Sequence, residues 1–451
     1  MSTEQKTAAI EIVRTLRERG FQAYLVGGCV RDLLLEREPA DYDVATDATP
    51  NEVMEIFPKT YAVGAQFGVV LVDTGDWQLA TGNCIEVATF RNDGIYSDGR
   101  HPDEVRYTRT PQEDVQRRDF TINGLLLDPL ENNKVLDFVG GQFDLKAGVI
   151  RTIGDAERRF TEDKLRMMRG VRFAARFGYV IEEKTMRAIR ELAPSIHEVS
   201  RERVRDELTK MLTEGRARRA FELLDESRLL PEVLPEIARM KGVEQPPQYH
   251  PEGDVWVHTL MLLEPLPPNV SPTLAWGALL HDVGKPPTFR VAPDRIRFDS
   301  HAEVGAKMAE EICHRMRFSN EETEKIVELV SNHMRFPEVT RMRESTLKRF
   351  LRMPNFGEHI ELHRLDCGAS HRDLTLYNFV NEKLSALPEE EIRPKPLITG
   401  DDLIAGGYQP GPRFKEILSA CEDAQLEGRV QDKSQALEWV KENFPVSVEK
   451  S

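Results

Sequence analysis

The 451-residue sequence has few cysteines, no long apolar run and no excess of basic charge. Its five cysteines are scattered and show no CxxC spacing, so neither a disulfide framework nor a zinc knuckle is predicted. No apolar run approaches the ~20 residues that a membrane-spanning helix needs, and the N-terminal segment MSTEQKTAAI lacks the pattern of a secretion signal. These absences predict a cytoplasmic protein without a membrane partner.

The net charge of −15 is opposite in sign to that of a general nucleic-acid coat protein. Any contact with RNA must therefore come from local basic patches. The chain is 40% hydrophobic and 30% charged, which is typical of a globular protein, and its length suffices for two to four domains with cores of their own. No internal repeat or low-complexity segment is present, and no motif specifies the oligomeric state.

The most informative stretch is residues 24–47, YLVGGCVRDLLLEREPADYDVATD. The apolar run at its start predicts a short buried strand, Gly27 and Gly28 predict a tight turn, and the following residues predict a helix. The unpaired N–H groups of a helix start favour a phosphate, to which Arg31 would add a bidentate donor. A glycine pair between a strand and a helix is also a common packing device, so the pair alone leaves both interpretations open.

Two aspartates, Asp41 and Asp43, follow two positions apart. Residues at this spacing on a strand share a face, so both carboxylates would reach one divalent cation, which like charges held that close require. The alternative is an acidic turn, because Asp is a frequent turn residue. Thr49, Pro50 and Glu52 then mark the start of a helix. The pair is therefore expected to end a strand, just ahead of a helix.

This stretch resembles the signature of class II tRNA nucleotidyltransferases and bacterial poly(A) polymerases, members of the DNA polymerase β-like superfamily. The residues that carry the resemblance are Gly27, Gly28, Arg31, Asp32, Asp41 and Asp43. The resemblance implies an α+β nucleotidyltransferase head with a small mixed sheet, followed by an all-helical neck, body and HD domain. It also implies that the two aspartates hold the Mg²⁺ ions that activate an RNA 3′-hydroxyl and steady the leaving pyrophosphate.

The rest of the head, predicted over residues 1–150, contains a further strand and a loop. Residues 85–90, IEVATF, alternate as a strand does. The resemblance implies that Glu86 is a third metal carboxylate; the alternative is an edge-strand glutamate that faces water. Residues 91–102, RNDGIYSDGRHP, predict a loop, whose position resembles the flexible loop that supports the final A addition in CCA-adding enzymes. Such a loop argues against an enzyme that adds only CC.

A second charged motif comprises Arg117, Arg118 and Asp119. The two arginines can neutralise a triphosphate, and the aspartate can accept a hydrogen bond from a ribose hydroxyl. Taken alone, the motif is typical of an ordinary cluster of surface charges. Because it follows the first motif, it resembles the second sequence motif of the family. Residues 137–141, DFVGG, resemble the family's hinge motif, in which a glycine pair suits a bend between domains.

Residues 151–245 are predicted to form a helical neck and body, where Asp163 and Arg166 are three apart. On one helix both would project from the same face and reach the edge of a single base. Cytosine and adenine each present an amino donor beside a ring-nitrogen acceptor, which a carboxylate and a guanidinium match; uracil and guanine do not. The alternative is a routine ion pair on a helix surface.

The segment EDKLR around this pair resembles the base-selecting motif of the family, which implies that Asp163 and Arg166 replace a nucleic-acid template. Between residues 158 and 176, seven basic residues accompany two acidic ones, and Arg169, Arg172 and Arg176 extend the stripe toward triphosphate or RNA phosphates. Other candidates for an RNA track, each of which can also be simply solvated, are Arg201, Arg203, Arg205, Arg216, Arg218 and Arg219.

A proline-rich stretch over residues 244–251 marks the start of an HD region, predicted over residues 246–375. Six ligand-type residues here resemble the H…HD…D pattern of HD-type metal phosphohydrolases, with two extra histidines: His258, His281, Asp282, His301, His333 and Asp366. Imidazole and carboxylate ligands suit Mn²⁺, Ni²⁺, Fe²⁺ or Mg²⁺, and the lack of thiolates disfavours structural zinc. Lys285 could meet a phosphate. A lone histidine in such a segment would more often be a packed or exposed residue.

Residues 376–451 are predicted to form a helical C-terminal tail with a structural role. The sequence as a whole predicts a template-independent tRNA nucleotidyltransferase that adds CMP, CMP and AMP to tRNA 3′ ends from CTP and ATP, with an HD phosphohydrolase activity. An A-only adding enzyme or a poly(A) polymerase would share every motif. Alternatives of another class are an HD phosphohydrolase with a helper head, or a non-catalytic RNA-binding protein, which the presence of both metal aspartates disfavours.

Overall fold

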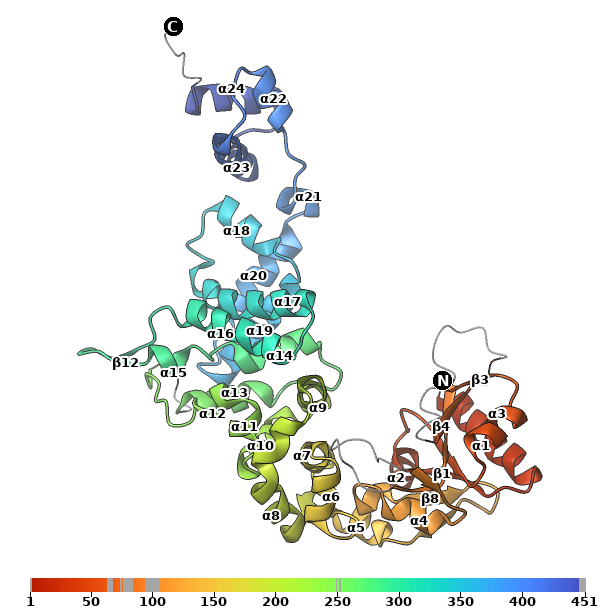
Figure 1. Cartoon of the computed structure of the whole chain (residues 1–451). Helices are drawn as coiled ribbons and strands as arrows, with labels where there is room; N and C mark the ends of the chain where they lie inside the picture. The colour runs from red at the N-terminus through yellow and green to blue at the C-terminus, as the bar shows by residue number, and fades with distance from the viewer. Residues whose placement is uncertain are drawn as a thin grey trace. The chain divides into compact units, whose positions relative to one another are not determined.

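The computed structural model describes residues 2–62, 68–73, 75, 84–93, 105–248, 250 and 253–445. The chain divides into two compact units, Met1–Ala238 with Leu266–Asn269, and Arg239–Pro265 with Val270–Ser451. Figure 1 shows the strands of the main sheet in red to orange, near the N-terminus, and helices from yellow to blue through the rest of the chain. Among the helices of the described residues, none is both long and apolar enough to cross a membrane.

The first unit begins with a mixed seven-stranded sheet in the order β3-β4-β5-β2-β1-β8-β9. Strands β2 and β5 run parallel, and the other neighbours run antiparallel. This sheet confirms the predicted α+β head. The strands are β1 Ala23–Val26, β2 Asp43–Thr46, β3 Thr60–Tyr61, β4 Val69–Asp73, β5 Cys84–Thr89, β8 Leu125–Asp128 and β9 Lys134–Asp137.

Apolar side chains cover both faces of this sheet. Helices α1 (Ser2–Glu18) and α3 (Pro50–Ile56) contribute Leu16 and Val53 to the core on one face. On the other face Tyr24 packs with Phe90 in a separate cluster. As a result, all four residues of β1 are buried. The antiparallel pairing of β1 with β2 sets Val26 opposite Asp43, which brings the two ends of the first motif side by side.

Short helices and strands complete the head. The capping box predicted at Thr49 is present, since the Thr49 side chain accepts from the Glu52 N–H and the Glu52 carboxylate accepts from the Thr49 N–H. The remaining elements are α2 Gly28–Leu34, β6 Arg91–Asp93, β7 Val105–Tyr107, α4 Pro111–Gln116, a 3₁₀ turn Thr121–Asn123, α5 Gly141–Ala147 and β10 Val149–Ile150.

The prediction of a loop over residues 91–102 is wrong for the first three residues. Residues 91–93 form β6, because they pair antiparallel with β7 in the register Arg91↔Tyr107. Residues 94–102 lie outside the described part of the chain.

The segment DFVGG at residues 137–141 forms a tight turn between β9 and α5. The Asp137 carboxylate accepts hydrogen bonds from four successive backbone N–H groups, those of residues 139–142, at 2.8–3.1 Å. Gly140 has a left-handed φ of 77°, and a Cβ on Gly141 would lie 2.2 Å from the Thr121 carbonyl oxygen. Both glycines lie inside the first compact unit, where the turn requires them.

Helices form the rest of the first unit. Helix α7 (Leu165–Phe177) buries Met167, Val171 and Ala174, which recur at helical spacing, and it packs against α9 (Arg201–Thr213) and α10 (Ala217–Glu226). This arrangement turns the arginines of α7 toward the head and toward α9. The other elements are α6 Ala156–Glu162, β11 Val180–Ile181, α8 Glu183–Leu192, α11 Leu230–Val233 and α12 Pro235–Ala238.

The second unit is helical apart from one short hairpin, β12 (Arg290–Val291) with β13 (Ile296–Arg297), among its described residues. The helices that carry the HD residues pack against one another, and Trp276 of α14 is fully buried. They are α13 Val255–Leu263, α14 Pro272–Leu280, α15 Lys285–Thr288, α16 His301–Arg315, α17 Asn320–Asn332 and α19 Phe356–Ala369. The rest are α18 Glu344–Leu351, α20 Thr375–Ala386, α21 Glu389–Ile392, α22 Gly400–Ala405, α23 Pro412–Leu426 and α24 Lys433–Asn443.

Candidate functional site

A cavity of about 550 Å³ in the first unit collects most of the residues predicted to hold a nucleotide. Of the predicted catalytic and nucleotide-binding set, Asp32 and Glu86 are absent from its described lining. Four further lining residues, Asn123, Leu165, Phe173 and Arg203, had no assigned nucleotide role. The predicted residues that line it are Gly27, Gly28, Arg31, Asp41, Asp43, Arg117, Arg118, Asp119, Asp163, Arg166, Arg169 and Arg172.

The two metal-type aspartates lie at the start of β2, so the prediction that they end a strand is wrong: the strand Asp43–Thr46 separates them from α3. Asp41 precedes the strand and is exposed, while Asp43 is its first residue and is partly buried. Burial, together with the charges of Asp41 and Glu86, raises the pKa of Asp43 to about 7, although Arg118 opposes the shift. A divalent cation beside these carboxylates would offset the repulsion, so the donor set fits Mg²⁺.

Glu86 lies directly opposite Asp43 in the parallel pairing of β2 with β5. Strand β5 has neighbours on both sides, so the edge-strand part of the alternative is wrong, whereas its exposure to water is confirmed. Its side chain is exposed and close enough to raise the pKa of Asp43. Among the described residues, however, these carboxylates form no group of three ligand atoms within 4.8 Å. A role for Glu86 as a third metal ligand therefore stays a prediction.

A buried carboxylate holds the paired arginines of the second motif. Asp114 on α4 is fully buried and accepts from Arg117 at 2.7 Å and from Arg118 at 3.0 Å. Burial opposes its ionisation, but the two guanidinium charges outweigh burial and lower the pKa of Asp114. Sequence reasoning missed this residue, whose signal is an acidic side chain three and four positions before two arginines on a helix.

Arg118 in turn lies against the glycine turn of the first motif. A Cβ on Gly27 would be 3.4 Å from the Arg118 Nη1 atom, and Gly27 has a φ of 75°, which an L side chain rarely adopts. The glycine therefore lets a cationic side chain approach the backbone at the start of α2.

Asp119 is buried and held by three groups. It accepts from the Arg169 guanidinium at 2.8 Å, from the Asn123 Nδ2 atom at 3.0 Å and from the Phe120 N–H at 2.7 Å. Burial opposes its charge, but Arg169 and Asn123 outweigh burial and lower the pKa of Asp119 to about 2. The carboxylate is thus ionised at neutral pH and remains an acceptor at the cavity wall.

Arg31 is buried and fixed on both sides. It donates to the Asp32 carboxylate at 2.8 Å and to the Asn123 Oδ1 atom at 2.7 Å, and its guanidinium lies 4.7 Å from the centre of the Phe177 ring. Asp32 therefore orients Arg31 from behind the cavity. Asn123 joins Arg31 to Asp119, a link that sequence reasoning missed because the residues come from different elements.

The prediction that Asp163 and Arg166 share one helix is wrong. Helix α6 ends at Glu162 and α7 begins at Leu165, and Asp163 between them is extended, with a φ of −146°. The reason is that the Asp163 carboxylate accepts from the Leu165 N–H at 3.1 Å, which satisfies a free donor at the start of α7. Both residues nevertheless line the cavity, as predicted.

Each member of this pair is held by further contacts. The second oxygen of Asp163 accepts from Arg203 of α9 at 2.8 Å. Arg166 donates to Glu162 at 2.9 Å and to the Arg117 carbonyl oxygen at 3.1 Å. The two groups are therefore pre-oriented by Glu162 within the EDKLR segment and by Arg117 and Arg203 outside it.

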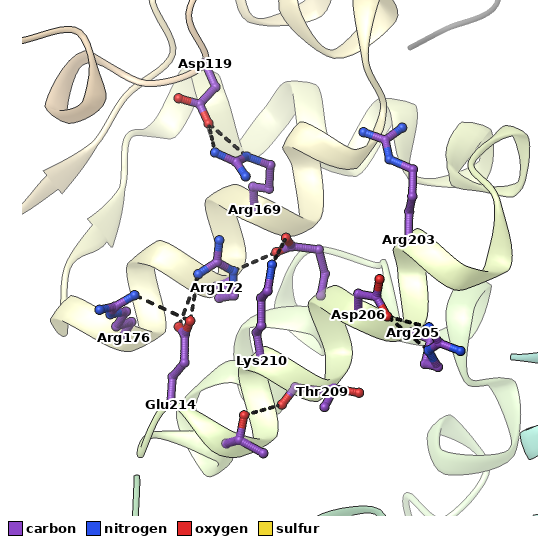
Figure 2. Close-up of polar contacts among 12 residues, drawn as sticks. Asp119, Arg169, Arg172, Arg176, Arg203, Arg205, Asp206, Thr209, Lys210 and Glu214 are labelled. Atoms are coloured by element: carbon purple, nitrogen blue, oxygen red, sulfur yellow. Dashed lines mark hydrogen bonds and ion pairs between the residues drawn. The ribbon is translucent and has the colours of Figure 1, made fainter. Parts of the chain in front are cut away.

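Acidic residues of the α9 region neutralise part of the arginine stripe on α7 (Figure 2). Arg172 is buried and donates to Glu207 at 2.7 Å, and Glu214 lies between Arg172 and Arg176. Several predicted RNA-track arginines likewise have acidic partners: Arg203 with Asp163, Arg205 with Asp206, Arg218 with Glu222, and Arg219 with Glu222 and Glu226.

The six predicted HD residues come together in the second unit. Their ligand atoms form two groups, each within 4.8 Å: His258, His281 and Asp366, and Asp282, His301 and His333. A cavity of about 980 Å³ is lined by four of them, Asp282, His301, His333 and Asp366, and also by Lys285, His250 and His363. The last two were not predicted, since an isolated histidine carries no signal in one sequence.

The electrostatics of this cluster suit metal ligands. Burial opposes the charge of Asp282, but the neighbouring His281 and Lys285 hold the pKa of this carboxyl well below its usual range. Burial and the nearby His281 lower the pKa of His333 to about 4. At neutral pH the imidazole of His333 is therefore uncharged, which is the form that binds a cation.

Comparisons with known proteins agree with this arrangement. Three family models match in order: the poly A polymerase head domain over residues 23–151, the probable RNA and SrmB-binding site of polymerase A over residues 178–241, and the HD domain over residues 256–364. The fold and the clustered side chains thus define a nucleotidyltransferase head followed by helical RNA-binding and HD segments. Heads and HD domains of these kinds imply dependence on divalent metal ions.

Among curated relatives, the CCA-adding enzyme of Oceanobacillus iheyensis is 46% identical over 211 residues, which are 47% of this chain and 51% of the relative. That of Lactobacillus helveticus is 40% identical over 261 residues, 57% of this chain and 63% of the relative. The chain therefore spans about half of the first relative's length.

A crystal structure of the Bacillus stearothermophilus CCA-adding enzyme in complex with CTP matches with a TM-score of 0.71 and 27% identity, covering 97% of both chains. Residues 23–151 thus match the poly A polymerase head domain, residues 256–364 match the HD domain, and the chain is similar in fold to a CCA-adding enzyme over nearly all of its length.

Proposed function

We propose that this protein adds CMP, CMP and AMP to the 3′ ends of tRNA, with CTP and ATP as substrates. The observation that carries the proposal is one cavity in the first unit that combines paired carboxylates, a group of arginines and the pair Asp163 and Arg166. The curated relatives and the CTP-bound structure support the same activity.

Asp41 and Asp43 are the residues that would hold Mg²⁺. When bound, the ions would supply electrostatic stabilisation of the attacking and leaving oxygens during phosphoryl transfer. In the proposed reaction the RNA 3′-hydroxyl attacks the α-phosphate of the nucleotide, a new phosphodiester bond forms and pyrophosphate leaves.

The arginines would bind the triphosphate. Arg117 and Arg118 are held in place by Asp114, so they lose little conformational freedom when a phosphate arrives. Asp119 is ionised and held by Arg169, and it would accept a hydrogen bond from a ribose hydroxyl. This contact would favour ribonucleotides.

Asp163 and Arg166 would select the base. A carboxylate oxygen has more than one lone pair, so Asp163 can accept from an amino group of cytosine or adenine while it holds Arg203 and the Leu165 N–H. Arg166 would donate to the ring nitrogen beside that amino group. UTP and GTP would match neither group, because they present a carbonyl oxygen and a ring N–H instead.

The test incubates the purified chain and Mg²⁺ with tRNA transcripts that end before CCA, after C and after CC, with CTP and ATP singly and together. The proposal predicts that the bare transcript gains three nucleotides only when both are present, and that extension then stops. Extension of the CC-ended transcript alone, by one A, would make the protein an A-only adding enzyme. A long ATP ladder would make it a poly(A) polymerase.

A second activity, metal-dependent phosphohydrolysis, is proposed for the HD residues. The two buried ligand groups of the second unit favour it, together with the ammonium group of Lys285 beside Asp282. Hydrolysis of p-nitrophenyl phosphate with Mn²⁺, by the wild-type chain and by Asp282→Ala, tests it. A signal that Asp282→Ala retains would contradict the proposal.

A further inference from the structure

We infer that three arginines at the C-terminal end of α7, Arg37, Arg176 and Arg216, bind phosphates of the RNA strand beside the nucleotide cavity. These residues form the α7-end cluster, and all three belong to the first compact unit. The inference rests on the proposed function and names a contact surface for its RNA substrate. Arg37 was not among the residues predicted from the sequence.

The ring of Phe177 brings two members of the cluster together. The Cζ atoms of Arg37 and Arg176 lie 5.4 and 5.5 Å from the centre of this buried ring. The guanidinium of Arg31 lies 4.7 Å from the same centre. An aromatic face attracts a guanidinium, whose N–H donors all lie in its own plane and so remain available to an anion. The ring thus gathers cations from different parts of the chain at one end of α7.

The third member of the cluster lies against the residue that follows this ring. Gly178 ends α7 in a left-handed conformation with a φ of 70°. A Cβ at Gly178 would lie 2.9 Å from the Nη1 atom of Arg216. Arg216 immediately precedes α10, which packs against α7. Glycine at this position therefore permits both the turn and the close approach of the guanidinium.

Two members of the cluster differ from the arginines of the cavity. Every arginine in the described lining of the cavity has a carboxylate partner at 2.7–3.4 Å. Arg176 is among them, since it shares Glu214 with Arg172 (Figure 2). Arg37 and Arg216 are exposed, and neither has a carboxylate partner in the part of the chain that the structure describes. Their charge is available to an external anion.

The same contrast separates Arg216 from the other arginines predicted to form an RNA track. Four of those have the acidic partners given above, and Arg201 donates to the Nδ1 atom of His197 at 3.2 Å. Among these six arginines, within the described residues, Arg216 makes neither kind of contact. The structure thus selects one arginine from a set that the sequence could not divide.

The positive charges at this end of α7 act on one another. Burial lowers the pKa of Arg31, and the charge of Arg176 lowers it further, although the Asp32 carboxylate opposes the shift. Burial raises the pKa of Tyr179, whose ring lies 5.6 Å from that of Phe177, whereas the charges of Arg37 and Arg31 oppose that rise. A phosphate among these cations would relieve their repulsion and accept charge-assisted hydrogen bonds.

The position of the cluster favours RNA over the nucleotide as its ligand. Arg176 lines the cavity, but Arg37 and Arg216 do not. The triphosphate is proposed to bind Arg117 and Arg118 inside the cavity. An anion that contacts all three members of the cluster extends beyond the cavity, as a strand of successive phosphodiesters does. Phosphate contacts carry no sequence information, so the cluster should act alike on different tRNA sequences.

The salt dependence of RNA binding tests the inference. Full-length wild type, Arg37→Gln, Arg216→Gln and the double variant are titrated with a fluorescent tRNA transcript that lacks CCA, without nucleotide, over about 50–300 mM KCl. Each single variant should raise the Kd about three- to tenfold. Each should also lower the slope of log Kd against log[KCl] by about 0.7–0.9, because one phosphate contact is lost. The double variant should lower that slope about twice as much.

Arg19→Gln is the matched control. Arg19 is an exposed arginine that follows α1, and it too has no carboxylate partner among the described residues. The substitution removes the same charge and should keep the wild-type slope. Steady-state extension with CTP then separates the two substrates: the KM for the transcript should rise in the cluster variants, while the KM for CTP stays within about twofold. Thermal unfolding establishes that each variant is folded.

The outcomes distinguish this inference from the proposed function. A double variant that keeps the wild-type slope, while the wild type adds CCA, would overturn the inference and leave the function intact. A higher KM for CTP with an unchanged Kd for the transcript would assign the cluster to the triphosphate and overturn the RNA contact. An equal loss of slope in Arg19→Gln would reveal a general charge effect and overturn it as well. A wild-type chain that neither binds nor extends the transcript would overturn both.

Discussion

The Arg203 guanidinium of α9 donates to the Asp163 carboxylate at 2.8 Å, so a residue 40 positions later in the chain fixes half of the proposed base-reading pair. Asp163 has only local contacts otherwise, at the break between α6 and α7. Its orientation in the cavity therefore depends on the packing of α7 against α9.

Substitution of Arg203 is expected to relax nucleotide choice. In Arg203→Ala the Asp163 carboxylate loses a charge-assisted hydrogen bond, which contributes about 1.5–3 kcal/mol. We expect kcat/KM for CTP and ATP to fall about 10- to 100-fold, and the ratio of CTP to UTP incorporation to fall as well. Single-nucleotide extension of a CCA-lacking transcript measures both.

Arg187→Ala provides the control, because this exposed arginine of α8 pairs only weakly with Glu183 on the same helix. An Arg203→Ala protein that keeps the wild-type ratio of CTP to UTP incorporation would contradict the role assigned to this contact.

Asp114 is expected to matter for triphosphate affinity. In Asp114→Asn the side chains of Arg117 and Arg118 lose their shared buried anion and become less ordered. The KM for CTP and ATP should rise about 10-fold, with a smaller change in kcat, because binding before chemistry is weakened. Steady-state kinetics with the transcript at saturating concentration measures KM and kcat separately. A change confined to kcat would contradict the role assigned to Asp114.

The free energy of unfolding should depend on pH through the ionisation of the Asp119 carboxylate. The pKa of Asp119 is about 2 in the folded chain against an ordinary value of 3.8. The contribution of the ionised carboxylate to the free energy of unfolding is therefore present above pH 3.8 and is lost as the pH falls through about 2. The stability difference between wild type and Asp119→Asn should therefore be constant above about pH 5 and shrink between about pH 4 and pH 2. Urea unfolding across this range measures it, and a difference that grows on acidification would contradict the assignment.

Two adjacent glycines of the β9–α5 turn should respond unequally to alanine. A Cβ on Gly140 meets nothing within 4 Å, so Gly140→Ala should cost only the left-handed backbone strain of about 1–2 kcal/mol. A Cβ on Gly141 would lie 2.2 Å from a backbone oxygen, so Gly141→Ala must displace the chain and should cost about 3 kcal/mol or more. Thermal unfolding compares them, and equal losses would contradict the packing described here.

Features that depend on residues close to one another in the sequence were predicted correctly. The strand–turn–helix at Gly27 and Gly28 and the cap at Thr49 follow from periodicity and turn chemistry, the α+β head follows from the family resemblance, and all are present. The helix break at Asp163 was not predicted, because charge spacing alone cannot distinguish a helix surface from a carboxylate that caps the next helix.

Contacts between distant segments were beyond sequence reasoning. Asn123 links Arg31 to Asp119, and Glu207 holds Arg172, through pairs that only the packed fold brings together. Such long-range partners determine how pre-ordered the cavity is, and no local pattern encodes them.

The most direct test of the central claim compares two full-length variants on a tRNA transcript that lacks CCA, with CTP, ATP and Mg²⁺. Asp43→Asn removes a proposed metal ligand of the head, and Asp282→Asn alters the HD cluster. The account predicts that Asp43→Asn loses extension by about 100-fold or more, while Asp282→Asn still adds three nucleotides and stops. Extension that survives in Asp43→Asn and disappears in Asp282→Asn would contradict the assignment of nucleotide addition to the head.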